Sequence, residues 1–193
     1  RPGANEQGAW DVGCVPERLP GYRWVSNAED RQALEALWDS SIPEIPGLSL
    51  THIIQGAASG RVKAMFLIGD SPNLSNGKLG DGLAALDNLE FLVVCDSFLG
   101  AAAQRADVVF PRATFAEKDG TFTNLERRIQ RLKPGRELPE RGARPEWRVI
   151  CDVAHKMGAP GFLLPSPSET MDEIARVAPV YAGVSYRSLT NQG

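Results

Sequence analysis

Three short apolar runs in the middle of the chain constrain its fold more than any other feature. They cover Val62–Ile68, Phe91–Cys95 and Asp107–Phe110, and each stops abruptly at a Gly, Asp or Pro. Continuous apolar runs, rather than alternating ones, are typical of strands covered on both faces, as in a parallel sheet. We therefore expect these runs to be strands of one mainly parallel sheet.

Segments with helical periodicity and capping residues lie before, between and after these runs. The expected helices begin near Asn27, Ser49, Gly82, Ser97, Glu146 and Ser168. Strands that alternate with helices in this way form half of a doubly wound fold, with right-handed crossovers. The predicted fold class is therefore α/β, a three-layer αβα domain with a mainly parallel, Rossmann-like sheet.

The chain of 193 residues has the length of one domain with a sizeable core. We expect one domain over residues 1–193, made of a loop at residues 1–25, a helical insertion at residues 26–60 and an α/β part at residues 61–193. Dense turn residues predict that residues 1–22 are irregular. Because the chain begins with Arg1 and not with Met, we interpret it as an interior piece of a longer polypeptide.

The composition is that of an ordinary globular protein, with 42% apolar and 23% charged residues. A net charge of −3 gives no reason to expect a nucleic-acid or membrane partner. No apolar run approaches the roughly 18 residues that a membrane-spanning helix needs. Nothing at the amino end resembles a signal peptide. We therefore expect a cytoplasmic protein without membrane contact from this segment.

The cysteines and histidines do not form a metal-binding pattern. The 3 cysteines, Cys14, Cys95 and Cys151, are far apart in the sequence, and an odd number does not fit a closed disulfide framework. We interpret them as reduced, buried thiols. The 2 histidines lie in unrelated contexts. No metal ligand is therefore predicted, neither a zinc site nor an iron–sulfur site.

Acidic residues follow two of the predicted strands. Asp70 comes after Val62–Ile68, and Asp96 comes directly after Phe91–Cys95. Open α/β sheets bind ligands at the carboxyl ends of their strands. A carboxylate there can accept hydrogen bonds from a ribose diol or from the N1–H and N2–H₂ edge of a guanine. The alternative is that each side chain only caps a helix or closes a turn.

Other chemical signals are weaker. Lys118 can supply a point charge for a phosphate, and the alternative is a solvated surface lysine. The glycine spacings match neither a dinucleotide-binding fingerprint nor a phosphate-binding P-loop. There is no Gly-x-Ser-x-Gly sequence and no cysteine with a histidine partner. On this chemistry alone, the segment is not predicted to be a self-sufficient enzyme.

An ordered set of short strings covers nearly all of the chain and carries a family resemblance. The strings are Asn5–Ala9, Asp11–Gly13, Leu19–Tyr22, Ile68–Pro72, Val93–Phe98, Ala106–Pro111, Glu117–Asn124, Glu126–Gln130 and Ala143–Trp147. Through them the chain resembles part of the large subunit of molybdopterin-dependent oxidoreductases, nearest to the catalytic subunit of formate dehydrogenase. It is also similar to the related large subunit of NADH–quinone oxidoreductase.

The resemblance implies that the chain is a middle domain of a formate-oxidising enzyme that produces CO₂. This domain would hold one of two guanine dinucleotide arms of a bis-pterin molybdenum or tungsten cofactor, shared with other domains. An iron–sulfur cluster is expected only outside this segment. The implied partners are the other domains of the same large subunit and electron-transfer subunits. By itself the segment is expected not to turn over.

The resemblance also assigns roles to individual residues. Cys95 and Asp96 fall where the family grips the guanosine end of the cofactor, and Lys118 and Glu146 fall beside the same pocket. Gly69 and Asp70 match the family's loop after the first strand. The residues Asn5, Gln7 and Gly8 match a loop that approaches the pterin and the metal.

Arg1 matches an arginine that lies beside the substrate in formate dehydrogenases. There it would orient the formate carboxylate electrostatically. Here Pro2-Gly3-Ala4-Asn5 follows, where those enzymes have Gly-Gln-Asn-Asn, so the match is partial. This difference leaves open that the chain belongs to another member of the family. Such a member would have another substrate, like a nitrate reductase, or no metal, like the quinone-oxidoreductase subunit. A ligand-free scaffold or subunit-docking domain is the remaining alternative.

Overall fold

The computed structural model describes residues 4–69, 81–136 and 142–190. The chain divides into two compact units, which are described separately. The sheet unit consists of Leu48–Lys118 and Pro134–Val153, and the hairpin unit consists of Arg1–Gly47, Asp119–Lys133 and Ala154–Gly193. The predicted boundaries at residues 25 and 60, which separate the loop, the helical insertion and the α/β part, are not tested by this division and remain a prediction.

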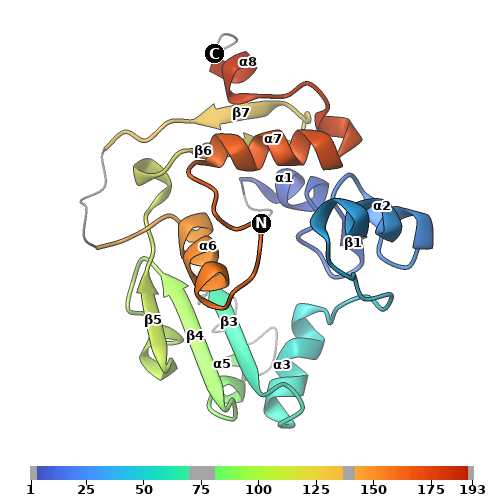
Figure 1. Cartoon of the computed structure of the whole chain (residues 1–193). Helices are drawn as coiled ribbons and strands as arrows, with labels where there is room; N and C mark the ends of the chain where they lie inside the picture. Colours follow the sequence, from blue (N-terminus) through green and yellow to red (C-terminus); the bar gives the residue numbers. More distant parts are fainter. Residues whose placement is uncertain (1–3, 70–80, 137–141, 191–193) are drawn as a thin grey trace. The chain divides into compact units, whose positions relative to one another are not determined.

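The sheet unit is built on three parallel strands, in the order β3-β4-β5. They are β3 (Ala64–Ile68), β4 (Phe91–Asp96) and β5 (Val108–Pro111), drawn side by side in Figure 1. The register aligns Ile68 with Cys95 and aligns Asp96 with Pro111, so the carboxyl ends of the strands form one edge. The predicted α/β class with a parallel sheet is thereby confirmed.

Helices connect these strands, as the alternation predicted. The unit contains α3 (Leu50–Ala58), α5 (Gly82–Leu86), the 3₁₀ turns η1 (Ala103–Arg105) and η2 (Phe115–Glu117), and most of α6 (Glu146–Lys156). Ser49 caps α3 by accepting a hydrogen bond from the amide of His52. The helix expected from Ser97 was wrong, since only η1 forms there. The hydroxyl of Ser97 instead donates to the carbonyl of Arg112, 3.0 Å away.

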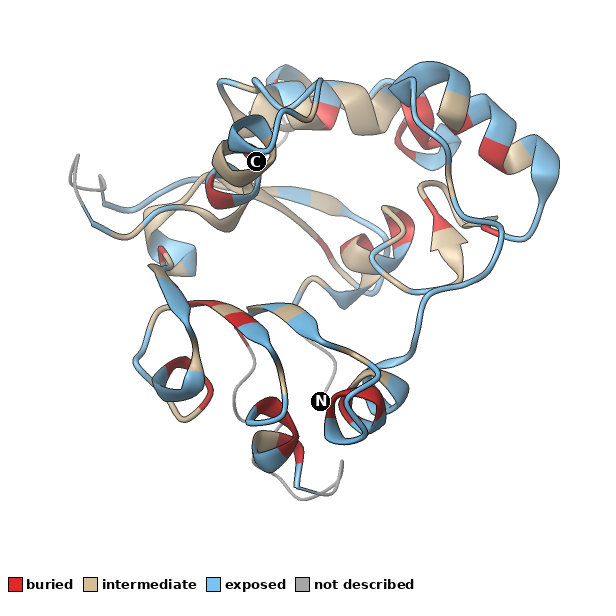
Figure 2. Cartoon of the chain, turned by 60° about the horizontal axis from the view of Figure 1, so that its bottom comes forward, coloured by how far each residue is buried: buried red, intermediate tan, exposed pale blue. Residues whose placement is uncertain are grey.

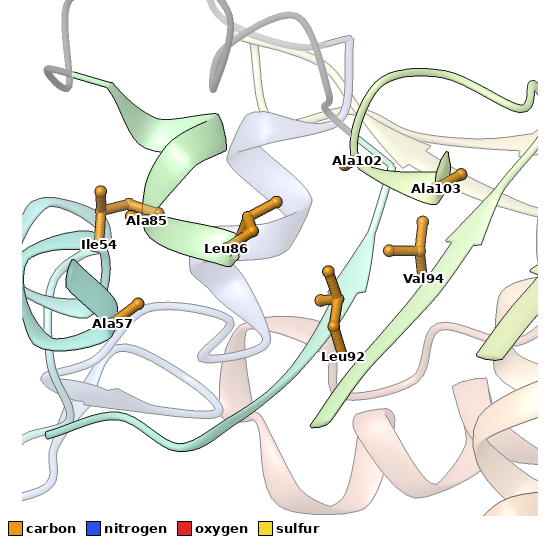
Figure 3. Packing of buried hydrophobic residues seen from close by; sticks show 8 residues of the cluster. All are labelled: Ile54, Ala57, Ala85, Leu86, Leu92, Val94, Ala102 and Ala103. Carbon is orange, nitrogen blue, oxygen red and sulfur yellow. The ribbon is translucent and has the colours of Figure 1, made fainter. Parts of the chain in front are cut away.

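One face of the sheet packs on the helices and forms the core of the sheet unit (Figure 3). The buried cluster consists of Ile54, Ala57, Ala85, Leu86, Leu92, Val94, Ala102 and Ala103. Because strand side chains alternate between faces, Phe66, Ile68 and Phe91 point to the opposite face, where they are between 38% and 47% exposed. Figure 2 shows this contrast as red and pale blue segments along the strands.

The hairpin unit has its own core and mostly local elements. These are α1 (Glu6–Asp11), β1 (Arg18–Leu19), β2 (Arg23–Trp24), α2 (Ala28–Trp38), β6 (Gly120–Thr123), β7 (Ile129–Leu132), α7 (Pro167–Val177), η3 (Pro179–Tyr181) and α8 (Tyr186–Thr190). Leu34, Met171 and Tyr181 are among its most buried side chains. Strands β6 and β7 pair antiparallel. None of the helices in the described part of the chain has the length and apolar character that a membrane crossing needs.

The expectation of an irregular segment over residues 1–22 was wrong for Glu6–Asp11 and Arg18–Leu19. It contains helix α1 and the strand β1, which pairs antiparallel with β2. Helix α1 ends before Gly13, which has a φ of +78°, a conformation that few other residues adopt. Elements this short leave no readable hydrophobic period, so turn residues dominated the prediction.

Truncating a side chain in the sheet unit's core should destabilise the protein. We expect Leu92→Ala, at a side chain only 1% exposed, to lower the free energy of unfolding by about 2–5 kcal/mol. The matched control is Leu99→Ala, at a side chain 68% exposed, where the loss should stay within about 0.5 kcal/mol. Urea unfolding followed by circular dichroism measures both. Equal losses in the two variants would contradict the assigned core.

Candidate functional site

The carboxyl edge of the parallel sheet brings three strand ends together by main-chain hydrogen bonds. The amide of Gly69, after β3, donates to the carbonyl of Cys95 at 2.9 Å. The amide of Arg112, after β5, donates to the carbonyl of Asp96 at 3.0 Å. Parallel strands end at a common edge, which is where open α/β sheets bind ligands. The edge is therefore the candidate site in this unit.

A second chain segment reaches the same edge through a short β-bridge. Arg112 pairs with Arg144 in parallel, flanked by hydrogen bonds from the Ala113 amide to the Arg144 carbonyl and from the Arg144 amide to the Pro111 carbonyl. Helix α6 begins two residues later, at Glu146. The bridge thus places the first residue of α6 at the strand ends.

The carboxylate of Glu146 lies between two cations. Both of its oxygens are 2.6 Å from the Nζ of Lys118, and Oε1 is 3.4 Å from Nη1 of Arg112. The three side chains are between 19% and 29% exposed. Charges that are partly removed from water interact more strongly than exposed ones. Two cations share this carboxylate, so their remaining N–H groups can donate to a further anionic or acceptor group.

Gly69 makes room for the guanidinium of Arg112. A Cβ atom at Gly69 would lie 2.6 Å from Nη1 of Arg112, and the φ of Gly69 is +66°. Only glycine adopts this conformation easily and leaves the space open. The close approach of Arg112 therefore depends on glycine at this position.

Two hydrogen-bond donors near this edge have no acceptor among the described residues. They are Nε of Arg112 and the indole Nε1 of Trp147, and both nitrogens are buried. Buried donors in folded proteins almost always have a partner, so each such case needs an explanation. A polar ligand bound at this edge would bring an acceptor near the guanidinium of Arg112.

Asp96 and Cys95 form the end of β4. One oxygen of Asp96, Oδ1, accepts from the amide of Ser97 at 2.6 Å, which is the turn-closing role considered as an alternative. Its Oδ2 has no hydrogen bond within the described residues and can accept one from a ligand. Burial, and then the negative charge of Glu146, raise the pKa of the Cys95 thiol. Cys95 is therefore a neutral, packed thiol, not a nucleophile.

The other predicted site residues lie in the hairpin unit, on helix α1 and the residue before it. Oδ1 of Asn5 accepts from the amide of Thr123 at 2.8 Å, which ties α1 to β6. Gly8 is required for this contact, because a Cβ there would lie 2.3 Å from the same oxygen. Nε2 of Gln7 donates to Oδ1 of Asp11 at 2.9 Å and to the hydroxyl of Tyr22 at 2.5 Å.

A buried polar network holds Asp11 in place. The hydroxyl of Tyr181 donates to Oδ2 of Asp11 at 3.1 Å and lies 2.7 Å from Oγ1 of Thr123. Asp11, Thr123 and Tyr181 are each 3% exposed. Burial raises the pKa of Tyr181 to about 12, so its hydroxyl stays protonated at neutral pH. This network fixes the position of α1, which carries Gln7 and Gly8.

The predicted site residues thus divide between the two units. Gly69, Cys95, Asp96, Lys118 and Glu146 share the sheet edge, and Asn5, Gln7 and Gly8 share α1 and its start. Arg1 and Asp70 lie outside the described residues. The sequence reasoning missed Arg112, although this residue lies two positions after the predicted strand Asp107–Phe110, near the strand end that is the same kind of signal as the one for Asp96. Tyr181 was missed because nothing in a linear pattern links it to Asp11.

Comparisons with known proteins agree on one family. A family model described as molybdopterin oxidoreductase matches residues 4–156. The probable oxidoreductase YjgC of Bacillus subtilis is 43% identical over 96% of this chain, and the F420-dependent formate dehydrogenase 2 subunit alpha of Methanococcus maripaludis is 41% identical over 98%. The putative formate dehydrogenase YrhE of Bacillus subtilis is 39% identical over 96%. The chain spans between 19% and 28% of the length of these relatives.

A solved structure shares the fold. Acetylene hydratase from Pelobacter acetylenicus superimposes with a TM-score of 0.61 over 98% of this chain and 24% of its own, at 18% sequence identity. At this level of identity the likeness concerns the fold alone.

A methyl group at Gly69 should disturb the sheet edge. Gly69→Ala would place alanine at a positive φ and displace Arg112. Gly60→Ala would also place alanine at a positive φ, +72°, but its Cβ would have no neighbouring atom of the described residues within 4 Å. We expect Gly60→Ala to cost about 1–2 kcal/mol of unfolding free energy. Gly69→Ala should cost about 1 kcal/mol more, the low end for overpacking, because the atom that its methyl group meets is the far end of a flexible side chain. Denaturant unfolding of both variants tests this. Equal losses would show that Arg112 does not pack against Gly69.

Alkaline titration should report on the buried tyrosines. Of the 3 tyrosines, Tyr181 and Tyr186 have pKa values raised by burial to about 12, above the ordinary value of 10.0. Their contribution to stability is complete below the unfolded pKa and is lost as pH rises through the folded pKa. Tyrosinate absorbance should therefore show two late ionisations, and Tyr181→Phe should remove one. Ionisation of all tyrosines near their ordinary pKa would contradict the buried network.

Proposed function

The chain belongs to the molybdopterin oxidoreductase family, and from this premise we propose that it is part of a formate dehydrogenase. The whole enzyme would oxidise formate to CO₂, and this part alone would be inactive. Family membership implies a molybdopterin cofactor. The proposal of formate as substrate is supported by two of the relatives above, whose names contain formate dehydrogenase and which match at least 96% of this chain.

Within this enzyme, we propose that the sheet unit holds the guanine end of one dinucleotide arm of the cofactor. The observation that carries the proposal is the cluster of Asp96, Arg112, Lys118 and Glu146 at the carboxyl edge of a parallel sheet. This is the edge at which α/β sheets bind nucleotides. The cluster contains both signs of charge, as a guanine nucleotide requires.

The chemistry of the cluster fits guanine in particular. The N1–H and N2–H₂ groups of guanine are donors and match the second oxygen of Asp96, which accepts no hydrogen bond within the described residues. O6 and N7 of guanine are acceptors and match the guanidinium of Arg112. Adenine lacks the N1–H and the 2-amino group, so it would leave the Asp96 carboxylate unpaired. The site should therefore prefer guanine to adenine.

Glu146 would act as a positioning residue for the two cations. Its carboxylate holds the Nζ of Lys118 through both oxygens and keeps Nη1 of Arg112 within 3.4 Å. An ammonium and a guanidinium held in this way lose less side-chain freedom when a ligand binds. Lys118 would then serve as a point charge for a phosphate or a ring oxygen.

The remaining predicted residues belong to the same proposal. Asn5, Gln7 and Gly8 would approach the pterin, and Arg1 would orient the formate carboxylate by its charge. The bound cofactor would supply the redox chemistry, while the chain supplies binding and orientation. A second dinucleotide arm, an iron–sulfur cluster and electron-transfer subunits are proposed for the rest of the enzyme. We also propose that it is cytoplasmic.

Titration with nucleotides tests the guanine site. We expect GMP to bind this chain saturably in the millimolar range or tighter, and AMP, which carries the same phosphate, to bind at least about tenfold more weakly. Asp96→Asn should weaken GMP binding about tenfold or more, since a hydrogen bond to a charged group is worth about 1.5–3 kcal/mol. Nuclear magnetic resonance titration measures these affinities.

The matched control is Asp87→Asn, because Asp87 pairs with Arg105 on the surface of the same unit. This variant should bind GMP as the unmodified chain does. Equal binding of GMP and AMP, together with no effect of Asp96→Asn, would contradict a guanine site. In the full-length enzyme, Asp96→Ala should lower the guanine nucleotide content of the purified protein.

A further inference from the structure

Two side chains in the hairpin unit contact each other from strained backbone positions. The described residues include non-glycine residues with positive φ at Tyr22 (64°), Asp39 (48°) and Arg127 (61°). Nη2 of Arg127 lies 3.4 Å from the hydroxyl of Tyr22, and its guanidinium carbon lies 5.1 Å from the centre of the tyrosine ring. Such conformations are unfavourable and gather at functional sites.

The turn between β6 and β7 explains why the backbone of Arg127 is left-handed, but not why the residue is arginine. The amide of Asn124 donates to the carbonyl of Arg128, and the amide of Arg127 donates back to the carbonyl of Asn124. Glycine is the preferred residue at a left-handed position of such a hairpin turn. Arginine here is less favourable for the turn than glycine, and its side chain is the part that contacts Tyr22.

The backbone of Tyr22 is held just as firmly. Nη1 of Arg18 donates to the carbonyl of Tyr22 at 2.9 Å, and the guanidinium of Arg18 stacks on the ring of Trp24 at 3.2 Å. Gly21, with a φ of +81°, precedes Tyr22. The chain therefore turns sharply at this point and directs the phenol toward Gln7 and Arg127.

The hydrogen-bond network fixes which way the hydroxyl of Tyr22 donates. The carboxylate of Asp11 only accepts, so the amide of Gln7 must present its NH₂ group to Asp11 and, from the same nitrogen, to Tyr22. The oxygen of Tyr22 thus accepts from Gln7 at 2.5 Å and from Arg127 at 3.4 Å. Its own hydrogen points elsewhere and finds no acceptor in the described part of the chain.

The charge of Arg127 is also uncompensated within the described residues. The neighbouring acid, Glu126, pairs with Arg128 at 3.4 Å, and no carboxylate of the described part of the chain lies within ion-pair distance of Arg127. Asp11, the nearest acid in this network, is already engaged by Gln7 and Tyr181. Among the described residues, the phenol hydrogen of Tyr22 therefore has no acceptor, and the guanidinium beside it has no carboxylate partner.

We propose that Tyr22 and Arg127 form a binding site for an oxyanion, that is, a phosphate or carboxylate group. Guanidinium and hydroxyl donors are the groups that such anions prefer, and a fork of two N–H groups can bind two oxygens at once. Gln7 holds the phenol so that it can only donate to the ligand. The proposal goes beyond the guanine site, since it concerns the other unit and requires no base.

Titration of this chain with inorganic phosphate and, separately, with formate tests the site. Ionic strength is kept constant with chloride, and nuclear magnetic resonance follows the ring of Tyr22 and the Nε–H of Arg127. We expect saturable binding of at least one of the two anions. Saturation by phosphate alone assigns the site to a phosphate group, and saturation by formate alone assigns it to a carboxylate.

Two variants separate binding from folding. Tyr22→Phe removes only the hydroxyl, and Arg127→Gly removes the cation while relieving the positive φ, so it should unfold at the same or a higher urea concentration. Both should weaken anion binding at least tenfold. The matched control Arg128→Gln removes a neighbouring cation and should change binding less than twofold.

The proposal is overturned if neither anion saturates, or if Arg128→Gln weakens binding as much as Arg127→Gly, which would indicate a general attraction of charge. It is also overturned if Tyr22→Phe leaves binding unchanged. The preference for GMP over AMP should persist in Tyr22→Phe, and phosphate binding should persist in Asp96→Asn. Either site can therefore fail without the other.

Discussion

The guanidinium of Arg112 packs against Gly69 and reaches Glu146, and the sheet edge is organised around this contact. The main chain of Arg112 bonds to β4 on one side and bridges to Arg144 on the other. Its position therefore couples three strand ends to the start of α6. This arrangement brings the carboxylate of Glu146 within reach of both Lys118 and the guanidinium of Arg112. The absence of a side chain at Gly69 leaves the space that the guanidinium occupies.

The hairpin unit differs from the sheet unit in that a buried carboxylate organises its polar contacts. This carboxylate, Asp11, accepts from Gln7 of the same helix on one oxygen and from Tyr181, 170 positions away in the sequence, on the other. A buried polar network of this kind stabilises only when every member is paired. Because Asp11 can only accept, the NH₂ group of Gln7 donates both to Asp11 and to the oxygen of Tyr22. The hydroxyl hydrogen of Tyr22 is therefore free to be donated to another acceptor.

Much of the sheet unit could be predicted from the sequence, because continuous apolar runs and capping residues are signals that lie within a few neighbouring residues. The strands β3, β4 and β5 and the Ser49 cap lie within a few residues of their expected places. The hairpin of β6 and β7 and the short helix α1 could not be predicted in this way. The two hairpin strands contain polar residues instead of a continuous apolar run, and the six residues of α1 carry too little helical periodicity. Glu146 and Lys118 were assigned to one pocket by resemblance, and the ion pair between them depends on the Arg112–Arg144 bridge.

The sequence by itself determined the α/β class, the alternation of parallel strands with helices, and the family. These follow from hydrophobic patterns and motifs that are read along the chain. Only the tertiary structure decided which polar groups meet: Arg112 with Glu146, Tyr181 with Asp11, and Arg127 with Tyr22. The physical reason is that hydrogen bonds and ion pairs act over a few ångströms in space, whereas the partners are separated by up to 170 positions in the chain.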